Sequence, residues 1–162
     1  NNASKMLKTL LNKDKIYLAN IRQSKVRLKT RIKEQGFNEL VDLAGNIHKD
    51  IFIKEVDIND VDRIYEIEYR VLYKGSEYKC LKVSKETLDI NYLTIYTSDS
   101  TIAEKYGFIE KEQFIYDKDV LLDEIDALVE IKKPILNFSY LKEQKKIINQ
   151  KDVRDYLATI IE

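Results

Sequence analysis

Very few residues of this 162-residue chain have the types and spacing that covalent chemistry needs. His48 could act as a general acid or base, and Cys80 could act as a nucleophile. His48, however, stands beside Lys49 and Asp50 at the end of a predicted helix, where we interpret it as a solvated histidine that interacts with the helix dipole. Cys80 falls on the apolar side of a predicted strand, as buried filler residues do. We therefore predict no catalytic residue and expect a protein that is not an enzyme.

The sequence also disfavours metal and nucleotide cofactors. Structural zinc needs three or four Cys, His or carboxylate ligands, and the chain has one His and one Cys far apart. Residues 57–62 are similar to the start of a calcium loop, but the fifth position is Val61 and the sixth, which needs Gly, is Asp62. The four glycines are scattered, whereas phosphate cradles need clustered ones. We predict no metal site and no cofactor.

Charge is distributed unevenly along the chain. Residues 1–35 contain ten Lys or Arg and two acids, a net charge of +8, whereas residues 36–162 contain eighteen bases and twenty-six acids, a net charge of −8. A basic surface attracts phosphates, and an acidic surface attracts cationic proteins, so this asymmetry indicates charged partners. The candidate nucleic-acid-binding residues are Arg22, Lys25, Arg27, Lys29, Arg31 and Lys33. The candidate residues for a basic protein partner are Asp119, Asp123, Glu124, Asp126 and Glu130.

The basic residues are predicted to lie on a long N-terminal helix. Residues 4–34 contain no Gly or Pro, and apolar residues recur there at spacings of four and three. These residues are Leu7, Leu11, Leu18, Ile21, Leu28 and Ile32. Asp14 and Lys25 interrupt the seam, which favours packing against the chain's own body over an independent coiled coil. With a second helix expected over residues 37–48, residues 1–49 form a basic helical region.

The apolar period changes to two from Ile51, which is typical of strands. Strands are expected over residues 51–56, 65–73, 92–97 and 108–116, with a type II′ hairpin turn that places Tyr73 opposite Tyr78. Helices are expected over residues 100–107 and 119–133, and then over residues 139–149 and 151–161. Residues 50–162 thus form an acidic α+β body, in which an antiparallel meander of about four to five strands precedes C-terminal helices. We expect one cooperative domain.

Residues 73–130 contain a series of short motifs. They are Tyr73-Lys74-Gly75-x-Glu77-Tyr78 at a strand end, Thr97-x-Asp99 after a strand, Tyr106-Gly107-Phe108, and Tyr116-x-Lys118-x-Val120 before a predicted helix. This pattern resembles one found in bacterial toxin-immunity proteins and covers about a third of the chain. The resemblance implies a small non-enzymatic protein that binds and blocks one cognate toxin. An acidic body would independently suit masking of a cationic nuclease surface.

Three functional hypotheses follow. The first is an immunity-type inhibitor that presents the five candidate acids to a basic toxin. The second is a nucleic-acid-binding accessory protein of a phage or mobile element, which uses the basic N-terminal helix. The third is a structural protein that forms a homodimer through the apolar seam of that helix. The basic helix could also be an ordinary solvated face docked on the acidic helix.

The expected location of the protein is the cytoplasm. The lone Cys80 cannot form an internal disulfide and suits a reducing compartment. No apolar run approaches the roughly 20 residues that span a bilayer. We expect no membrane contact.

Overall fold

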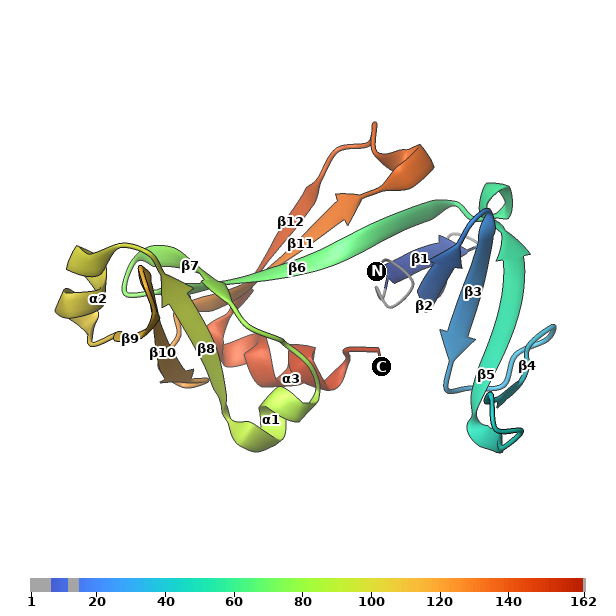
Figure 1. Ribbon diagram of the computed structural model, residues 1–162, viewed down its shortest axis with the longest axis horizontal. Coiled ribbons are helices and arrows are strands. Elements are labelled where there is room, and N and C mark those ends of the chain that lie inside the picture. The colour runs from blue at the N-terminus through green and yellow to red at the C-terminus, as the bar shows by residue number, and fades with distance from the viewer. Residues whose placement is uncertain (1–6, 12–14, 162) are drawn as a thin grey trace. The chain divides into compact units, whose positions relative to one another are not determined.

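The computed structural model describes residues 7–11 and 15–161, and these residues form a mostly β protein (Figure 1). They contain twelve strands and three short α-helices. Their contacts divide the chain into two compact units. The first unit comprises residues 1–67, 132–143 and 161, and the second comprises residues 68–131, 144–160 and 162. The expected boundary at residue 49 lies inside a strand of the first unit.

The first unit is built on antiparallel strands. In spatial order they are β4 (Asn38–Val41), β5 (Ile47–Asp57), β3 (Lys25–Thr30), β2 (Lys15–Arg22), β1 (Leu7–Leu11) and the first residues of β6 (Arg63–Tyr73). Of these strands, β1–β2, β2–β3 and β4–β5 pair as neighbours in the chain, whereas β3 pairs with β5 and β1 pairs with β6. Figure 1 shows β3 and β5 side by side. Two short 3-10 turns, η2 (Ile58–Asp60) and η3 (Leu136–Phe138), belong to the same unit.

One face of these strands packs around a hydrophobic core. The buried members are Tyr17, Ala19, Val26, Leu28, Phe37, Val61 and Ile64. The rings of Tyr17 and Phe37 stack with centroids 5.3 Å apart. Because successive side chains of a strand point to opposite faces, Leu18 on β2 and Arg27 on β3, which stand between core residues, point away from this core.

The second unit combines strands with all three α-helices. Its strands are the remainder of β6, β7 (Ser76–Cys80), β8 (Tyr92–Thr97), β10 (Ile115–Leu121), β9 (Ile109–Glu112), β11 (Ala127–Pro134) and β12 (Gln144–Asn149). Its helices are α1 (Glu86–Ile90), α2 (Ser100–Tyr106), the 3-10 turn η4 (Gln150–Asp152) and α3 (Val153–Ala158). The strands β6 and β11 have residues in both units.

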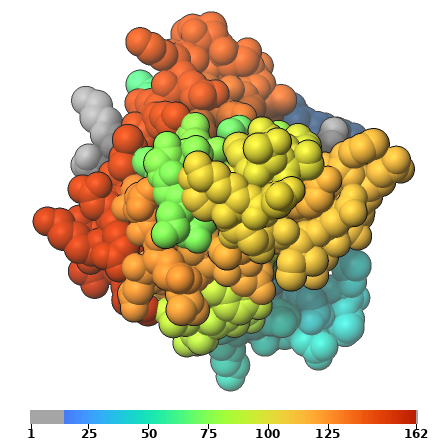
Figure 2. Space-filling view, turned by 90° about the vertical axis from the view of Figure 1, so that its left-hand side faces the viewer, coloured from blue at the N-terminus to red at the C-terminus, as the bar shows by residue number. Residues whose placement is uncertain are grey.

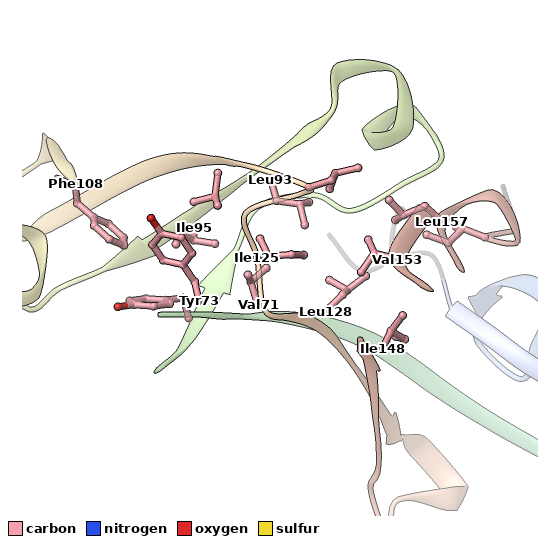
Figure 3. Close-up of a cluster of buried hydrophobic side chains, with 14 of the residues drawn as sticks. Val71, Tyr73, Leu93, Ile95, Phe108, Ile125, Leu128, Ile148, Val153 and Leu157 are labelled. Carbon is pink, nitrogen blue, oxygen red and sulfur yellow. The ribbon is translucent and has the colours of Figure 1, made fainter. Parts of the chain in front are cut away.

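A separate core holds the second unit together. Figure 3 shows Val71, Leu93, Ile95, Leu128 and their neighbours pointing toward one another, and these four side chains are at most 2% exposed. Aromatic residues extend this core toward α2, where the Tyr73 and Tyr106 rings meet edge to face with centroids 6.4 Å apart. Figure 2 shows α2 in yellow beside the β6–β7 turn in green on this side of the unit.

The predicted α+β fold with a long N-terminal helix is wrong. The strands β1, β2 and β3 lie between residues 7 and 30 where the long helix was expected, and β4 and β5 replace the second helix. The parts of the predicted helix at residues 4–6 and 12–14 lie outside the described residues. The strands β10 and β11 replace the helix expected over residues 119–133, and β12 replaces the helix at 139–149. The apolar residues of β2 and β3 fit a helical period as well, so the pairing of these strands in the sheet decides their structure.

Several local predictions are confirmed. The strands β6 and β8 match their expected positions, and α2 begins after the cap Asp99 and ends at Gly107. The final helix is present as the shorter α3. The hairpin turn, however, is shifted by one residue. Tyr73 pairs with Ser76, and Lys74 and Gly75 both have positive φ (51° and 80°), as a type I′ turn requires.

Along the stretches covered by the structure, no helix is long and apolar enough to cross a membrane.

Leu28 and Ile32 distinguish the strand from the helix experimentally, because both residues would be buried in the helical seam. In the structure Leu28 is fully buried on β3, whereas Ile32 follows that strand and is 73% exposed. We expect Leu28→Ala to lower the free energy of unfolding by about 2–5 kcal/mol, because it leaves a cavity in the core. Ile32→Ala should change it by less than about 0.5 kcal/mol. Urea unfolding measures both, and equal losses would contradict the strand assignment.

Candidate functional site

The strand β3 separates apolar from cationic side chains. Val26 and Leu28 are fully buried in the core of the first unit. Lys25 and Arg27 are exposed and Lys29 is half-buried, and these three occupy the alternate positions. Since alternate residues share one face of a strand, all three cations lie on the face opposite the core. Burial of the apolar residues therefore fixes which way the cations point.

Neighbouring strands extend this outward face. In the pairing of β2 with β3, Arg22 lies opposite Lys25 and Asn20 lies opposite Arg27. We call the four cations Arg22, Lys25, Arg27 and Lys29 the basic face. Three of them come from consecutive outward positions of one strand, and the fourth comes from the adjacent strand at the same hairpin.

The next strand, β5, adds two acids to the same side of the sheet. Asp57 lies opposite Lys25, and Glu55 lies opposite Arg27. The carboxylate of Asp57 is 3.8 Å from Lys25 Nζ and also accepts a hydrogen bond from the backbone N–H of Asn59, which caps η2. The acidic run at residues 57–62 thus forms a turn around η2. The carboxylate of Asp57 already has two partners within the first unit, whereas the side chain of Glu55 is exposed.

A cavity of about 310 Å³ lies against the basic face. Its lining residues all belong to the first unit and are Asn20, Ile21, Arg22, Lys25, Arg27, Leu43 and Glu55. Three of the six candidate nucleic-acid-binding residues therefore surround one cavity. Of the other three, Lys29 lies further along β3, and Arg31 and Lys33 follow the end of that strand.

The cations of the basic face are largely free to bind a ligand. Arg22, Arg27 and Lys29 form no hydrogen bond or ion pair with another residue of the described ranges, 7–11 and 15–161. Within those ranges, Lys25 has only its long contact with Asp57. Arg31, by contrast, is 3.4 Å from the carboxylate of Asp50. Unpaired guanidinium and ammonium groups gathered on one surface are donors suited to phosphate oxygens.

Asn20 contributes a polar atom that the protein itself does not satisfy. Its Oδ1 is buried and accepts no hydrogen bond from the part of the chain that the structure describes. An unsatisfied buried acceptor costs about 1–3 kcal/mol, so a donor from a ligand in the adjacent cavity would be stabilising. Asn20, Leu43 and Glu55 were not predicted as site residues. The alternation of Lys25, Arg27 and Lys29 with Val26 and Leu28 was the signal that could have placed Asn20 on this face.

The five candidate acids lie in the second unit and do not share a helical face. Asp119 is on β10 and accepts a hydrogen bond of 2.7 Å from Thr94 Oγ1. The turn between β10 and β11 holds Asp123, Glu124 and Asp126. Each of these three carboxylates already has a partner nearby. These contacts stabilise turns and strand ends of the second unit.

The contacts of the turn acids are specific. Arg154 Nη2 is 3.3 Å from Asp123 Oδ1. Glu124 Oε1 accepts from the backbone N–H of Leu121 at 3.0 Å, and Asp126 Oδ2 accepts from the N–H of Gly75 at 3.1 Å. The Asp126 side chain therefore links the β6–β7 turn to the start of β11 through a hydrogen bond. Any partner that bound these carboxylates would compete with the bonds that order the two turns.

Glu130 is buried within the second unit and is only 7% exposed. The hydroxyl of Tyr156 donates to its carboxylate, and the hydroxyl oxygens of Tyr69 and Tyr156 are 2.9 Å apart. Because the Tyr156 hydroxyl uses its one hydrogen in the bond to Glu130, the hydroxyl of Tyr69 must donate the hydrogen bond between the two tyrosines. Burial, and then the hydrogen bond to Glu130, raise the pKa of Tyr156 far above its ordinary value. Glu130 therefore cannot belong to an exposed acidic surface.

The two residues with reactive side chains have ordinary structural contacts. His48 Nε2 is 3.0 Å from Asp42 Oδ2, and this hydrogen bond is the main cause that lowers the pKa of Asp42. Cys80 is half-buried, and its thiol lies 3.5 Å from the carbonyl oxygen of Tyr69. Burial raises the pKa of Cys80 to about 12, so it remains a thiol at neutral pH. The described residues contain no cluster of three or more His, Cys, Asp or Glu that could hold a metal ion.

Removal of the Tyr156 hydroxyl tests the structural role of Glu130. We expect Tyr156→Phe to lower the free energy of unfolding by about 1–3 kcal/mol, because a buried carboxylate then loses a donor. Tyr140→Phe is the matched control, since Tyr140 is 79% exposed, and it should have almost no effect. Urea unfolding of both variants makes the comparison. Equal stability of the two would show that Glu130 does not depend on this bond.

Comparisons with known proteins give a family but no activity. The matching family model is described as "Uncharacterised conserved protein UCP033725" and covers residues 13–137. No curated protein and no solved structure matches the chain. The matched region includes β2 to β11 and therefore contains the basic face, its cavity and the turn acids. Since the match spans well over half of the 162 residues, the chain belongs to the family of uncharacterised conserved proteins UCP033725.

Proposed function

We propose that this protein is a non-enzymatic binding protein that holds the phosphate backbone of a single-stranded nucleic acid on its basic face. The observation that carries the proposal is the arrangement of Arg22, Lys25, Arg27 and Lys29 on one outward sheet surface. Three of these cations have no partner among the residues described. Neutralised phosphates release counterions, which makes such binding favourable and dependent on salt.

The spacing along β3 supports an extended strand as the ligand. Alternate residues of a strand are separated by about 6.6 Å, because each residue rises about 3.3 Å. Lys25, Arg27 and Lys29 therefore form a row whose spacing is comparable to that of neighbouring phosphates along an extended single strand. No helix of the first unit is available among its described residues to enter a duplex groove. A row of strand cations suits a backbone ligand better than a groove.

Charge balance supports placing the ligand on the first unit. That unit contains sixteen Lys or Arg and eleven Asp or Glu, a net charge of +5, whereas the second contains twelve and seventeen, a net charge of −5. The acidic unit would repel a polyanion at low salt. We therefore expect a short binding site confined to β2, β3 and β5.

The other two hypotheses receive less support. An acidic-surface toxin inhibitor stays a prediction, but four of its five proposed carboxylates have local partners at the surface and Glu130 is buried. Dimerisation through an N-terminal helix loses its basis, because the described part of that segment forms the strands β1, β2 and β3.

The double variant Arg22→Ala, Lys29→Ala tests the basic face. We expect it to weaken binding of fluorescein-labelled oligothymidylate and to reduce the slope of log K against log salt concentration by about 1.4. Each lost phosphate contact on a single strand contributes about 0.7 to that slope. Fluorescence anisotropy at several salt concentrations measures both quantities.

Lys79→Ala, Lys82→Ala is the matched control. Both lysines are exposed and belong to the second unit, and their replacement removes the same total charge. This control should bind as tightly as the wild-type protein. The proposal fails if the wild-type protein does not bind oligothymidylate at low salt, or if the control loses as much affinity as the test variant.

A further inference from the structure

The cavity beside the basic face is lined by a carboxylate, that of Glu55, which phosphate binding does not require. Asn20 Oδ1 is buried and unsatisfied by described residues, and Glu55 lines the same cavity from β5. Glu55 is exposed and forms no ion pair with Arg27, although the two residues lie opposite each other on paired strands. A carboxylate repels phosphate, so Glu55 weakens a purely phosphate-binding surface. An acceptor at this position suits a ligand group that donates hydrogen bonds.

The three polar residues across the sheet follow a fixed order. Arg27 on β3 pairs with Asn20 on one side and with Glu55 on the other. Arg27, whose guanidinium has five N–H donors, therefore lies between two residues that carry acceptor oxygens, and all three residues line the same cavity. The cavity volume of about 310 Å³ lies at the lower end of the range of small-ligand sites, about 300–1,000 Å³. This size suits one nucleotide and not a longer segment.

Guanine is the base whose edge best matches the neighbouring pair Arg27 and Glu55. Its Watson–Crick edge carries two neighbouring donors, N1–H and the N2 amino group, beside the O6 acceptor. A carboxylate can accept from both donors, and an arginine can donate to O6 and N7. Adenine and cytosine each present one amino donor beside ring acceptors, and thymine presents one N–H between two carbonyl groups. None of these offers Glu55 a pair of donors.

We infer that the cavity binds one guanine base of the nucleic acid strand held on the basic face. Glu55 accepts from N1–H and N2–H, and Arg27, which lies opposite Glu55 on the paired strand, donates to O6. Leu43, an exposed aliphatic side chain that lines the cavity, packs against the face of the base. Arg22, Lys25 and Lys29 remain for the flanking phosphates. The inference rests on the proposed function and adds base selectivity to it.

Three labelled oligothymidylates, each with one central replacement by guanine, hypoxanthine or adenine, test the inference in anisotropy titrations. Hypoxanthine keeps N1–H and O6 but lacks the N2 amino group. We expect the wild-type protein to bind the guanine strand about ten-fold more tightly than the adenine strand, which corresponds to one good bidentate contact. The hypoxanthine strand should fall between them.

Glu55→Gln is the informative variant, because Glu55 is exposed and its replacement leaves the core unchanged. It should reduce the preference for guanine over adenine to less than about two-fold, and affinity for plain oligothymidylate should stay equal or rise as a negative charge is removed. Glu39→Gln removes the same charge from an exposed position on β4 and is the matched control. It should keep the full guanine preference.

The outcomes separate the inference from the proposed function. Equal binding of the three strands would overturn guanine recognition while leaving phosphate binding intact, and failure of every strand to bind would remove the proposed function itself. A guanine preference that survives Glu55→Gln would also overturn the assignment. Guanosine 5′-monophosphate serves as a competitor. Displacement of the strand by micromolar amounts of it would identify a free nucleotide, and not a base within a strand, as the ligand.

Discussion

The alternation of side chains along β3 is the constraint on which the first unit depends. Val26 and Leu28 are fully buried, and this burial leaves Lys25, Arg27 and Lys29 no direction except outward. A slip of one residue in the pairing with β2 or β5 would bury three cations and expose two core residues. The free energy of forming the core therefore also fixes the geometry of the charged surface, and no separate interaction is needed to align the cations.

The two units use buried and exposed polar groups in different ways. In the second unit, the candidate acids have partners within the fold, as the bond of Tyr156 to Glu130 and the contact of Asp126 with Gly75 show, although the Tyr78 hydroxyl is buried there without a partner among the described residues. In the first unit, Asn20 and the cations beside it keep hydrogen-bonding capacity that the described residues do not use. Polar groups without internal partners cost stability and are commonly found where a ligand binds. This contrast is why we place the functional surface on the first unit.

Parts of the fold could be predicted from the sequence, and the failures have physical causes. The strand β6 and the helix α2 were recoverable because the first has strict alternation and the second has an Asp cap and a final glycine. The hairpin of β2 and β3 gave no such signal. Its turn contains Gln23 at φ 58° and no glycine, and the apolar residues of both strands happen to fit a heptad as well. Three of the six basic candidates, Lys25, Arg27 and Lys29, share one face despite this error because they alternate along β3, whereas the grouping of the acidic candidates depended on a helix that β10 and β11 replace.

The central claim is that ligand binding is located on the outward face of β2, β3 and β5. Mapping of backbone amide chemical shifts during titration with guanine-containing oligothymidylate tests it most directly, because it reports every residue at once. The account predicts shifts concentrated at Asn20, Arg22, Lys25, Arg27 and Glu55, with little change in the second unit. Shifts concentrated instead around Asp123 and Asp126, or an unchanged spectrum at saturating strand concentration, would contradict it.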